Sequence, residues 1–255
     1  MAFRTEAIKR VPAPNPHMLY IVATPIGNLE DLTYRAARIL AEVDVLACED
    51  TRRTRILLQR YNIRPPGKIL SYREQNETAA AERILKLLKE GKTVALCSDA
   101  GYPGLSDPGY RLLSAAAEKG IEVRVLPGAG AISTALLSSG LPSDSFTFKG
   151  FPPRKAGARR RFLEMDCNAP HTLVIFESPL RTAALLADAL AALGDRRAAV
   201  CIELTKMFEE VHRGWLSDLA SKFKGEKIKG EVTVVIAGNN PKFIRASGRR
   251  NPEQP

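Results

Sequence analysis

Short polar loops follow apolar runs at several places in the chain, and they hold the residues best suited to bind a ligand. Residues 24–29 (TPIGNL) and 98–109 (SDAGYPGLSDPG) are rich in glycine and proline, and residues 127–131 (PGAGA) contain only proline, glycine and alanine. Glycine lets a backbone approach a ligand closely, and backbone N–H and C=O groups can then bind it without side chains. We therefore expect a small-molecule site that is lined largely by backbone.

Acid–base candidates follow two other apolar runs. Asp50 lies in the segment CEDTRR, and Glu203 and Lys206 lie three positions apart in the segment ELTK. A positioned carboxylate or amine can take a proton from a reacting group, which contributes about 10²–10⁴-fold to a rate. A lysine near a carboxylate normally keeps its proton, so Lys206 is equally suited to bind phosphate. We take Asp50, Glu203 and Lys206 as candidate catalytic residues and leave both roles of the lysine open.

Several familiar signatures are incomplete in this chain. The GAG at residues 128–130 would need a third glycine, where Ser133 stands, to be a dinucleotide fingerprint. The GKT at residues 91–93 is not a phosphate-binding loop, because Lys86 stands where that loop needs glycine. The four cysteines show no CxxC spacing and the three histidines are far apart. We therefore expect neither nucleoside triphosphate hydrolysis nor a metal.

Apolar runs of strand length alternate with amphipathic runs of helical length through the first half of the chain. The expected strands are residues 19–23, 44–48, 68–71, 93–97 and 122–126. The expected helices are residues 31–43, 51–61, 77–90, 110–119 and 131–139. This alternation is typical of an α/β fold with a parallel sheet. Since ligands bind at the carboxyl ends of such strands, the polar loops should meet at one edge.

Prolines and glycines between positions 140 and 157 interrupt the alternation and predict a domain boundary. Beyond them, strands at 172–177, 197–204 and 231–237 and helices near 158–166, 180–193 and 216–223 predict a second, smaller α/β unit. The expected organisation is a flexible basic tail (1–17), an N-terminal α/β domain (18–141), a basic interdomain linker (142–157), a C-terminal α/β domain (158–238) and a disordered basic tail (239–255).

The formal net charge of +10 is concentrated in three segments, and the rest of the 255-residue chain is nearly neutral. Residues 149–161 contain six cations and no acid, and both terminal segments are also basic. A solvated linker is the simple explanation, but so dense a cluster favours a polyanionic partner such as nucleic acid. The six cations are Lys149, Arg154, Lys155, Arg159, Arg160 and Arg161.

Hydrophobic residues make up 45% of the chain, which is typical of a globular protein. No run approaches the roughly 18 uninterrupted apolar residues that a membrane-spanning helix needs. Residues 1–17 lack the apolar block of a secretory signal. We therefore expect a cytoplasmic protein that makes no contact with a membrane.

Seven motifs, in order along the chain, resemble those of the bacterial small-subunit rRNA ribose 2′-O-methyltransferases, a family within the tetrapyrrole methylase superfamily. The motifs are ATPIGNLEDLT at 23–33, CEDTRRT at 48–54, SDAGYPGLSDPG at 98–109, PGAGA at 127–131, FESPLR at 176–181, ELTKMFEE at 203–210 and GEVTVVIAG at 230–238. The resemblance covers almost all of the part expected to fold.

The resemblance implies two α/β domains of the class III methyltransferase type with a cofactor cleft between them, usually in a homodimer. It implies that S-adenosyl-L-methionine donates a methyl group to the ribose 2′-oxygen of cytidine 1402 in 16S rRNA of the small ribosomal subunit. The six cations of residues 149–161 would then hold the rRNA. Transferred residue by residue, the cofactor contacts fall on Pro25, Asp99, Ala100, Gly101, Gly130, Ala131, Phe176, Leu204 and Val232.

Two alternatives remain open at this point. A tetrapyrrole or other small-molecule methylase of the same fold would not need the six cations. An RNA-binding assembly factor that had kept the fold without catalysis would bind RNA but take up no S-adenosylmethionine.

Overall fold

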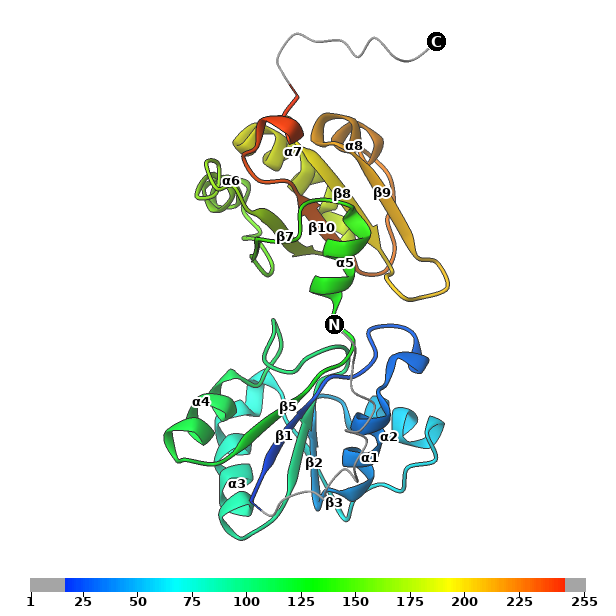
Figure 1. Cartoon of the computed structure of the whole chain (residues 1–255), viewed down its shortest axis with the longest axis vertical. Coiled ribbons are helices and arrows are strands. Elements are labelled where there is room, and N and C mark those ends of the chain that lie inside the picture. The colour runs from blue at the N-terminus through cyan, green and yellow to red at the C-terminus, as the bar shows by residue number, and fades with distance from the viewer. Residues whose placement is uncertain (1–16, 246–255) are drawn as a thin grey trace, which may run out of the picture. The chain divides into compact units, whose positions relative to one another are not determined.

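The computed structural model describes residues 17–245, and the chain forms two compact units, Met1–Gly130 and Ala131–Pro255 (Figure 1). The predicted basic tails lie outside the described residues, except for His17 and residues 239–245. That short C-terminal part contains a 3-10 helix, Pro241–Phe243, and Ile244 forms a β-bridge with Arg196. This part of the tail predicted to be disordered is therefore structured against the second unit.

The first unit is built on a five-stranded sheet. Its strands are β1 (Leu19–Val22), β2 (Val45–Cys48), β3 (Lys68–Ser71), β4 (Val94–Cys97) and β5 (Val123–Leu126). They lie in the order β3-β2-β4-β1-β5, and every neighbouring pair is parallel. The parallel sheet that the sequence predicted is confirmed.

Helices cover both faces of this sheet (Figure 1). They are α1 (Tyr34–Glu42), α2 (Thr51–Arg60), α3 (Glu77–Lys89) and α4 (Tyr110–Glu118). Side chains alternate along each strand, so Tyr20 and Leu46 pack against α1 and α2 while Ile21 and Ala47 pack against α3 and α4. Both faces are therefore buried, which explains why the central strands are apolar at every position.

The second unit contains a mixed five-stranded sheet. Its elements are α5 (Ala131–Ser139), β6 (Phe146–Phe148), α6 (Ala156–Glu164), β7 (Thr172–Glu177), α7 (Thr182–Leu193), β8 (Arg197–Ile202), β9 (Glu210–Trp215), α8 (Leu216–Lys222) and β10 (Val232–Ile236). The strand order is β6-β7-β10-β8-β9. Only β6 and β7 are parallel, and the other three pairs are antiparallel. The α/β class expected from the sequence is confirmed for both units.

Helix α5 packs against the sheet of the second unit, although the sequence placed it in the N-terminal domain, which was expected to end at residue 141. The Cys201 thiol lies 3.9 Å from the Ala135 carbonyl oxygen, and the Arg213 guanidinium donates to the Ser138 carbonyl at 2.9 Å. The two units divide at Gly130, before the glycines and prolines that marked the expected boundary. Helix α5 belongs to the second unit because its buried residues, such as Leu136, pack against the second sheet.

Two strands of the second sheet were not expected from the sequence. β6 has only three residues and lies in the segment assigned to the linker, and β9 is a polar edge strand without a fully buried residue. β6 is too short and β9 too polar to show the signals on which strand prediction depends. β6 becomes a strand because it pairs with β7, and β9 because it pairs with β8.

Candidate functional site

The carboxyl ends of four strands lie side by side in the first sheet. Val22 of β1 is in register with Cys97 of β4 and Leu126 of β5, and Cys48 of β2 is also in register with Cys97. The polar loops that follow these strands therefore start at one edge, which we call the strand-end edge. This is the arrangement that the sequence predicted for these loops.

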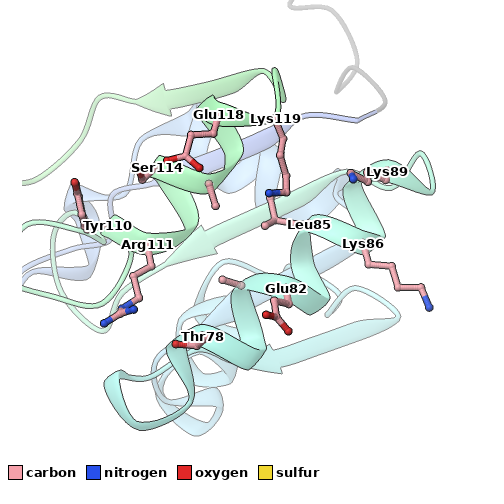
Figure 2. Close-up of a pocket in the computed structure, with 12 residues that line it drawn as sticks. Thr78, Glu82, Leu85, Lys86, Lys89, Tyr110, Arg111, Ser114, Glu118 and Lys119 are labelled. Atoms are coloured by element: carbon pink, nitrogen blue, oxygen red, sulfur yellow. Dashed lines mark hydrogen bonds between the residues drawn. The ribbon is translucent and has the colours of Figure 1, made fainter.

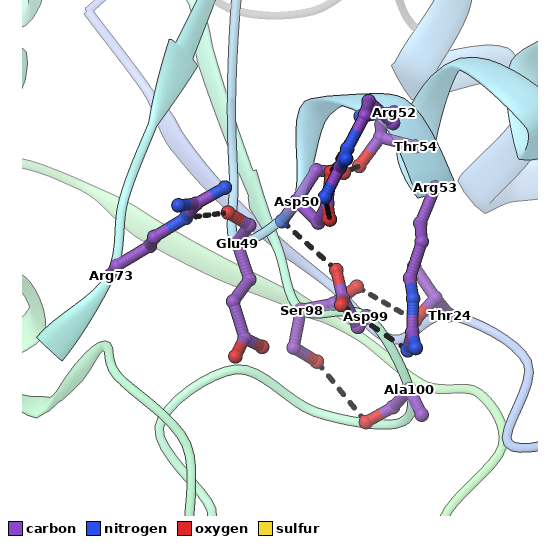
Figure 3. A network of polar contacts seen from close by, with 10 residues as sticks. All are labelled: Thr24, Glu49, Asp50, Arg52, Arg53, Thr54, Arg73, Ser98, Asp99 and Ala100. Carbon is purple, nitrogen blue, oxygen red and sulfur yellow. Dashed lines mark hydrogen bonds and ion pairs between the residues drawn. The ribbon is translucent and has the colours of Figure 1, made fainter.

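The loop after β1 is bound to the loop after β4. Thr24 and Gly101 exchange two backbone hydrogen bonds of 2.9 and 3.0 Å, and the Thr24 hydroxyl donates to the Ser98 carbonyl at 3.1 Å. The Ser98 hydroxyl donates to the Ala100 carbonyl (Figure 3) and also to the Gly101 carbonyl. Gly101 has a φ of 74°, a left-handed conformation that glycine adopts without strain. The predicted cofactor residues Ala100 and Gly101 are thus held in a fixed backbone conformation.

Asp99 joins the loop after β4 to the start of α2. Its carboxylate accepts the Asp50 backbone N–H at 3.0 Å and lies 3.4 Å from the Arg53 guanidinium (Figure 3). The Asp99 side chain therefore stabilises the strand-end edge itself.

Asp50, a candidate catalytic residue, caps helix α2. Its carboxylate accepts the Arg52 backbone N–H at 2.8 Å and forms an ion pair of 2.9 Å with the Arg52 guanidinium. Hydrogen bonds from the Arg52 side chain and backbone hold the pKa of the Asp50 carboxyl well below its usual range. An aspartate stabilised in this way is a weak proton acceptor near neutral pH.

The loop after β5 is fixed by Tyr102. The Tyr102 hydroxyl accepts the Gly128 backbone N–H at 2.8 Å. A Cβ atom on Gly128 would lie 2.9 Å from the Ala23 side chain, so the loops after β1 and β5 approach as closely as glycine permits. Pro25 is buried in the first of these loops. Gly130 ends the first unit and Ala131 begins α5 of the second.

The third strand also contributes to this edge, which the sequence did not predict. After β3, the Arg73 guanidinium donates to the Glu49 carbonyl at 2.8 Å (Figure 3). The Glu77 carboxylate accepts the Tyr72 hydroxyl at 3.1 Å and the Gly109 backbone N–H at 3.0 Å, and lies 3.5 Å from Arg111. No local motif reveals the longer of these contacts, because Arg73 and Glu49 are 24 positions apart and Glu77 and Gly109 are 32 positions apart.

In the second unit, three predicted cofactor residues lie at one edge of the sheet. β10 begins where β7 and β8 end, and Val232 is in register with Glu177 and Ile202. Leu204 and Val232 are buried. Phe176 packs edge-to-face against Phe148 and Phe151, with ring centroids 4.8 and 5.7 Å away. These three predicted cofactor residues are apolar, and the acids Glu177, Glu203 and Glu231 lie beside them at the same edge.

The two candidate catalytic residues of the second unit form an ion pair. The Lys206 ammonium lies 2.7 Å from Glu203 and 3.1 Å from Glu231, and the Glu231 backbone N–H donates to Glu203 at 2.8 Å. Glu203 and Thr205 have φ values of 51° and 66°, which are rare for non-glycine residues and cluster at functional sites. The loop after β8 is therefore held in an uncommon conformation around this ion pair.

The protonation states of this pair disfavour a lysine base. Burial alone would lower the pKa of Lys206, but its hydrogen bonds with Glu203 and Glu231 outweigh burial and raise the pKa. The hydrogen bond from Lys206 lowers the pKa of Glu203. Lys206 is consequently a cation and Glu203 an anion near neutral pH.

The six cations of residues 149–161 fall into two groups. The Lys149 side chain is 9% exposed and contacts Phe162 and Asp166, and Arg159 is buried with its guanidinium 2.6 Å from Asp188. Asp188 also binds Arg160, at 2.7 Å. Lys149 and Arg159 therefore hold α6 on the second unit. The exposed members of the segment are Arg154, Lys155, Arg160 and Arg161.

A groove of about 620 Å³ lies between α3 and α4, away from most of the strand-end loops (Figure 2). Its walls carry Glu82 and Glu118 as well as Lys86 and Lys119. Lys89 and Arg111 also line it, so the groove is surrounded by four cations and two acids. None of the predicted site residues lines this groove.

Residues 17–245 contain neither a metal-binding cluster nor a membrane-spanning helix. No cluster of three or more histidine, cysteine, aspartate or glutamate side chains there could hold a metal ion. In the same part of the chain, no helix is both long and apolar enough to span a bilayer.

Comparisons with known proteins agree on one family. The family model of the tetrapyrrole (corrin/porphyrin) methylases matches residues 18–220. A protein of Halalkalibacterium halodurans named ribosomal RNA small subunit methyltransferase I is 47% identical over 224 residues, which is 88% of this chain and 77% of that protein. A protein of Thermotoga maritima with the same name is 47% identical over 220 residues, which is 86% of this chain and 98% of that protein.

Solved structures share the fold at low sequence identity. The uroporphyrin-III C-methyltransferase of Thermus thermophilus superposes with a TM-score of 0.60 at 22% identity, covering 87% of this chain and 94% of that protein. Such a likeness supports the two α/β units and carries no information about the substrate.

Proposed function

The chain belongs to the tetrapyrrole (corrin/porphyrin) methylase family, and we propose that it is an S-adenosylmethionine-dependent enzyme that 2′-O-methylates the ribose of cytidine 1402 in 16S rRNA. The observation that carries this proposal is the 47% identity, over 86–88% of the chain, with relatives named for methylation of small-subunit ribosomal RNA. A ribosomal substrate agrees with action in the cytoplasm, and the motif resemblance implies a homodimer.

The backbone of the strand-end edge fits S-adenosylmethionine. Gly101 is left-handed, and Gly128 approaches Ala23 too closely for any side chain. Glycine at these two positions lets the loops pack this closely, and the motif resemblance implies that their backbone binds the adenosine of the cofactor. When bound, the cofactor would supply an electrophilic methyl group on its sulfonium sulfur. The residues proposed to bind it are Pro25, Asp99, Ala100, Gly101 and Gly130 in the first unit, and Ala131, Phe176, Leu204 and Val232 in the second.

We propose that catalysis depends mainly on positioning. Alignment of a hydroxyl with a methyl group can remove about 7–11 kcal/mol of a barrier. Asp50 and Glu203 have lowered pKa values and Lys206 a raised one, so all three would be ionised near neutral pH. Of the two roles open to Lys206, the structure favours that of a cation that binds phosphate or orients the substrate.

We propose that Arg154, Lys155, Arg160 and Arg161 contact rRNA phosphates. All four are exposed on α6 or directly before it. The buried ion pairs of Lys149 and Arg159 would contribute by holding α6 in place. Four neighbouring exposed cations on one rigid helix end suit a phosphate backbone.

The decisive experiment is transfer of labelled methyl from S-adenosylmethionine to small ribosomal subunits that lack the modification, followed by mapping of the labelled nucleotide. We expect one label, on the ribose of cytidine 1402. Uroporphyrinogen III serves as the competing acceptor, and label only on this tetrapyrrole would contradict the proposal. Calorimetric titration with S-adenosylmethionine separates the enzyme from a catalytically inactive assembly factor, which would take up none.

A further inference from the structure

Helix α2 presents an arginine-rich face to solvent. Its exposed positions include four arginines and Ile56, which is 63% exposed, while Thr54, Leu57 and Leu58 are buried in the first unit. The helix contains no acidic residue. The four arginines are Arg52, Arg53, Arg55 and Arg60.

The arginines differ in their partners along the helix. Arg52 and Arg53, next to the strand-end edge, pair with Asp50 and Asp99 at 2.9 and 3.4 Å. Among residues 17–245, no carboxylate lies within 4 Å of the guanidinium of Arg55 or Arg60. Within residues 17–245, the arginines in the second half of α2 therefore form no ion pair.

A groove of about 610 Å³ continues from this face. Arg60 lines it together with Tyr34, Tyr61 and Leu29. Tyr34 is 99% exposed, so its ring packs against nothing in the first unit. Tyr61 is fixed by a hydrogen bond from its hydroxyl to the Leu29 carbonyl. A free aromatic ring thus lies beside an unpaired guanidinium and an apolar wall.

We propose that the face of α2 and this groove bind a single-stranded segment of RNA, with phosphates on the arginines and a base stacked on Tyr34. Arginine and exposed aromatic side chains are the two components of single-strand binding surfaces. Glu30 and Asp31 also line the groove. Their carboxylates would repel phosphate and accept hydrogen bonds from base amino groups, which directs the backbone to α2 and the bases to the groove.

The surface lies next to the proposed cofactor loops of the same unit. α2 begins at Thr51, directly after Glu49 and Asp50 of the strand-end edge. An RNA strand that follows α2 toward its N-terminus would arrive at the loop of Asp99. The inference rests on the proposed function, because it names a surface that holds the RNA substrate.

Helix α3 supplies a matched control. Lys86 and Lys89 are exposed on it as Arg55 and Arg60 are on α2, but Lys86 is one helical turn from both Glu82 and Glu90, whereas α2 contains no acid. Arg55→Gln/Arg60→Gln and Lys86→Gln/Lys89→Gln remove the same charge from the same unit. Only the first pair should weaken binding of a single-stranded 16S rRNA fragment, by about tenfold at low salt. The slope of log affinity against log salt should fall by about 1.4. Equal losses in the two variants would overturn the proposal.

The groove is tested separately at Tyr34. Tyr34→Ala should weaken binding of the fragment about fivefold or more, while Tyr34→Phe, which keeps the ring, should bind as the wild type does. Equal affinity of all three proteins would exclude base stacking there. A change in the sedimentation of the protein alone, with RNA affinity unchanged, would identify a protein interface and also overturn the inference.

Wild-type methyl transfer to small subunits tests the proposed function independently. If the wild type methylates the ribosomal target while the α2 and Tyr34 variants match their controls, the inference fails and the proposed function stands. If the wild type methylates no ribosomal RNA, the proposed function itself fails.

Discussion

At the scale of single residues, Glu77 is the most connected carboxylate of the strand-end edge. It accepts hydrogen bonds from Tyr72, which follows β3, and from Gly109, which ends the loop after β4, and it pairs with Arg111 of α4. Burial and the neighbouring Glu77 charge raise the pKa of Tyr72, so its hydroxyl stays a donor. Glu77 thereby fixes the far end of the loop that carries Asp99, Ala100 and Gly101.

Glu77→Ala should destabilise the first unit by about 1–3 kcal/mol, because it leaves two partly buried donors without an acceptor. The same variant should bind S-adenosylmethionine more weakly, since the far end of the loop is released. Thermal unfolding and calorimetric titration measure the two effects. Glu82→Ala, at an exposed position of the same helix, is the control and should change stability by less than about 0.5 kcal/mol. Normal cofactor affinity in Glu77→Ala would show that the loop does not depend on this contact.

Lys206 allows a test of a cationic role against a basic one. If it acts as a cation, Lys206→Arg should keep most of the single-turnover methylation rate, and Lys206→Met should lose about tenfold or more. If Lys206 instead acts as a base, both variants should lose the rate, because arginine does not give up its proton. A rate for Lys206→Met equal to that of the wild type would show that Lys206 does not contribute to methylation.

The pH dependence of stability follows from the same ion pair. Because the pKa of Glu203 is lowered in the folded state, its ionised carboxylate adds to the free energy of unfolding above the ordinary pKa of 4.5. This stabilisation is lost as the pH falls through the folded-state pKa. Because the pKa of Lys206 is raised in the folded state, its charged ammonium adds to the free energy of unfolding below the ordinary pKa of 10.5. This stabilisation is lost as the pH rises through the folded-state pKa. The stability difference between the wild type and Lys206→Met, followed by denaturant unfolding, should therefore be constant from about pH 5 to pH 10. A change that centres near neutral pH would contradict these assignments.

At the scale of elements, one carboxylate fastens α6 to α7. Asp188 is 3% exposed and binds both Arg159 and Arg160. Since Arg159 is itself buried, removal of Asp188 would leave a buried guanidinium without its counterion. The exposed cations of α6 thus depend for their position on a side chain of a different helix.

Asp188→Ala should lower the free energy of unfolding by about 3–5 kcal/mol, as expected for a buried ion pair that loses one partner. Asp218→Ala removes a surface carboxylate 3.3 Å from Arg245 and should cost no more than about 1 kcal/mol. Urea titrations of the two variants give the comparison. Similar costs at the two positions would show that burial adds nothing to the Asp188 pair.

At the scale of the whole molecule, the net charge of +10 divides into cations that stabilise the fold and cations that remain available to RNA. In the segment 149–161 the structure assigns Lys149 and Arg159 to the first class. Arg154, Lys155, Arg160 and Arg161 remain exposed, and on α2 so do Arg55 and Arg60. Bulk charge alone would overestimate the number of cations that contact RNA.

Replacement of Arg154, Lys155, Arg160 and Arg161 by glutamine should reduce the slope of log RNA affinity against log salt by about 3, at roughly 0.7 to 0.9 per phosphate contact. The melting temperature should change little, because these side chains are exposed and Asp188 keeps its buried partner Arg159. Filter binding over a series of salt concentrations measures the slope. An unchanged slope would exclude the segment from the RNA interface.

Much of the fold and part of the site could be predicted from local patterns. The apolar runs that become β1, β2 and β4 are buried on both faces, so composition alone revealed the strands and their need for helices on both sides. Their parallel order placed the loops of Thr24, Asp50 and Asp99 at one edge. The half-exposed strand β9 lacked such a signal, because only its pairing with β8 makes it a strand.

By itself, the sequence determined the α/β class, the five parallel strands and the set of loops that meet at their ends, since these depend on periodicity and on the fixed direction of parallel strands. Only the tertiary structure decided that Glu77 and Arg73 support those loops and that α5 packs against the second sheet. It also decided that Lys149 and Arg159 form ion pairs with Asp166 and Asp188 of their own unit. The physical reason is that burial and charge pairing are set by neighbours distant in the chain. A single sequence does not specify which carboxylate each arginine will meet.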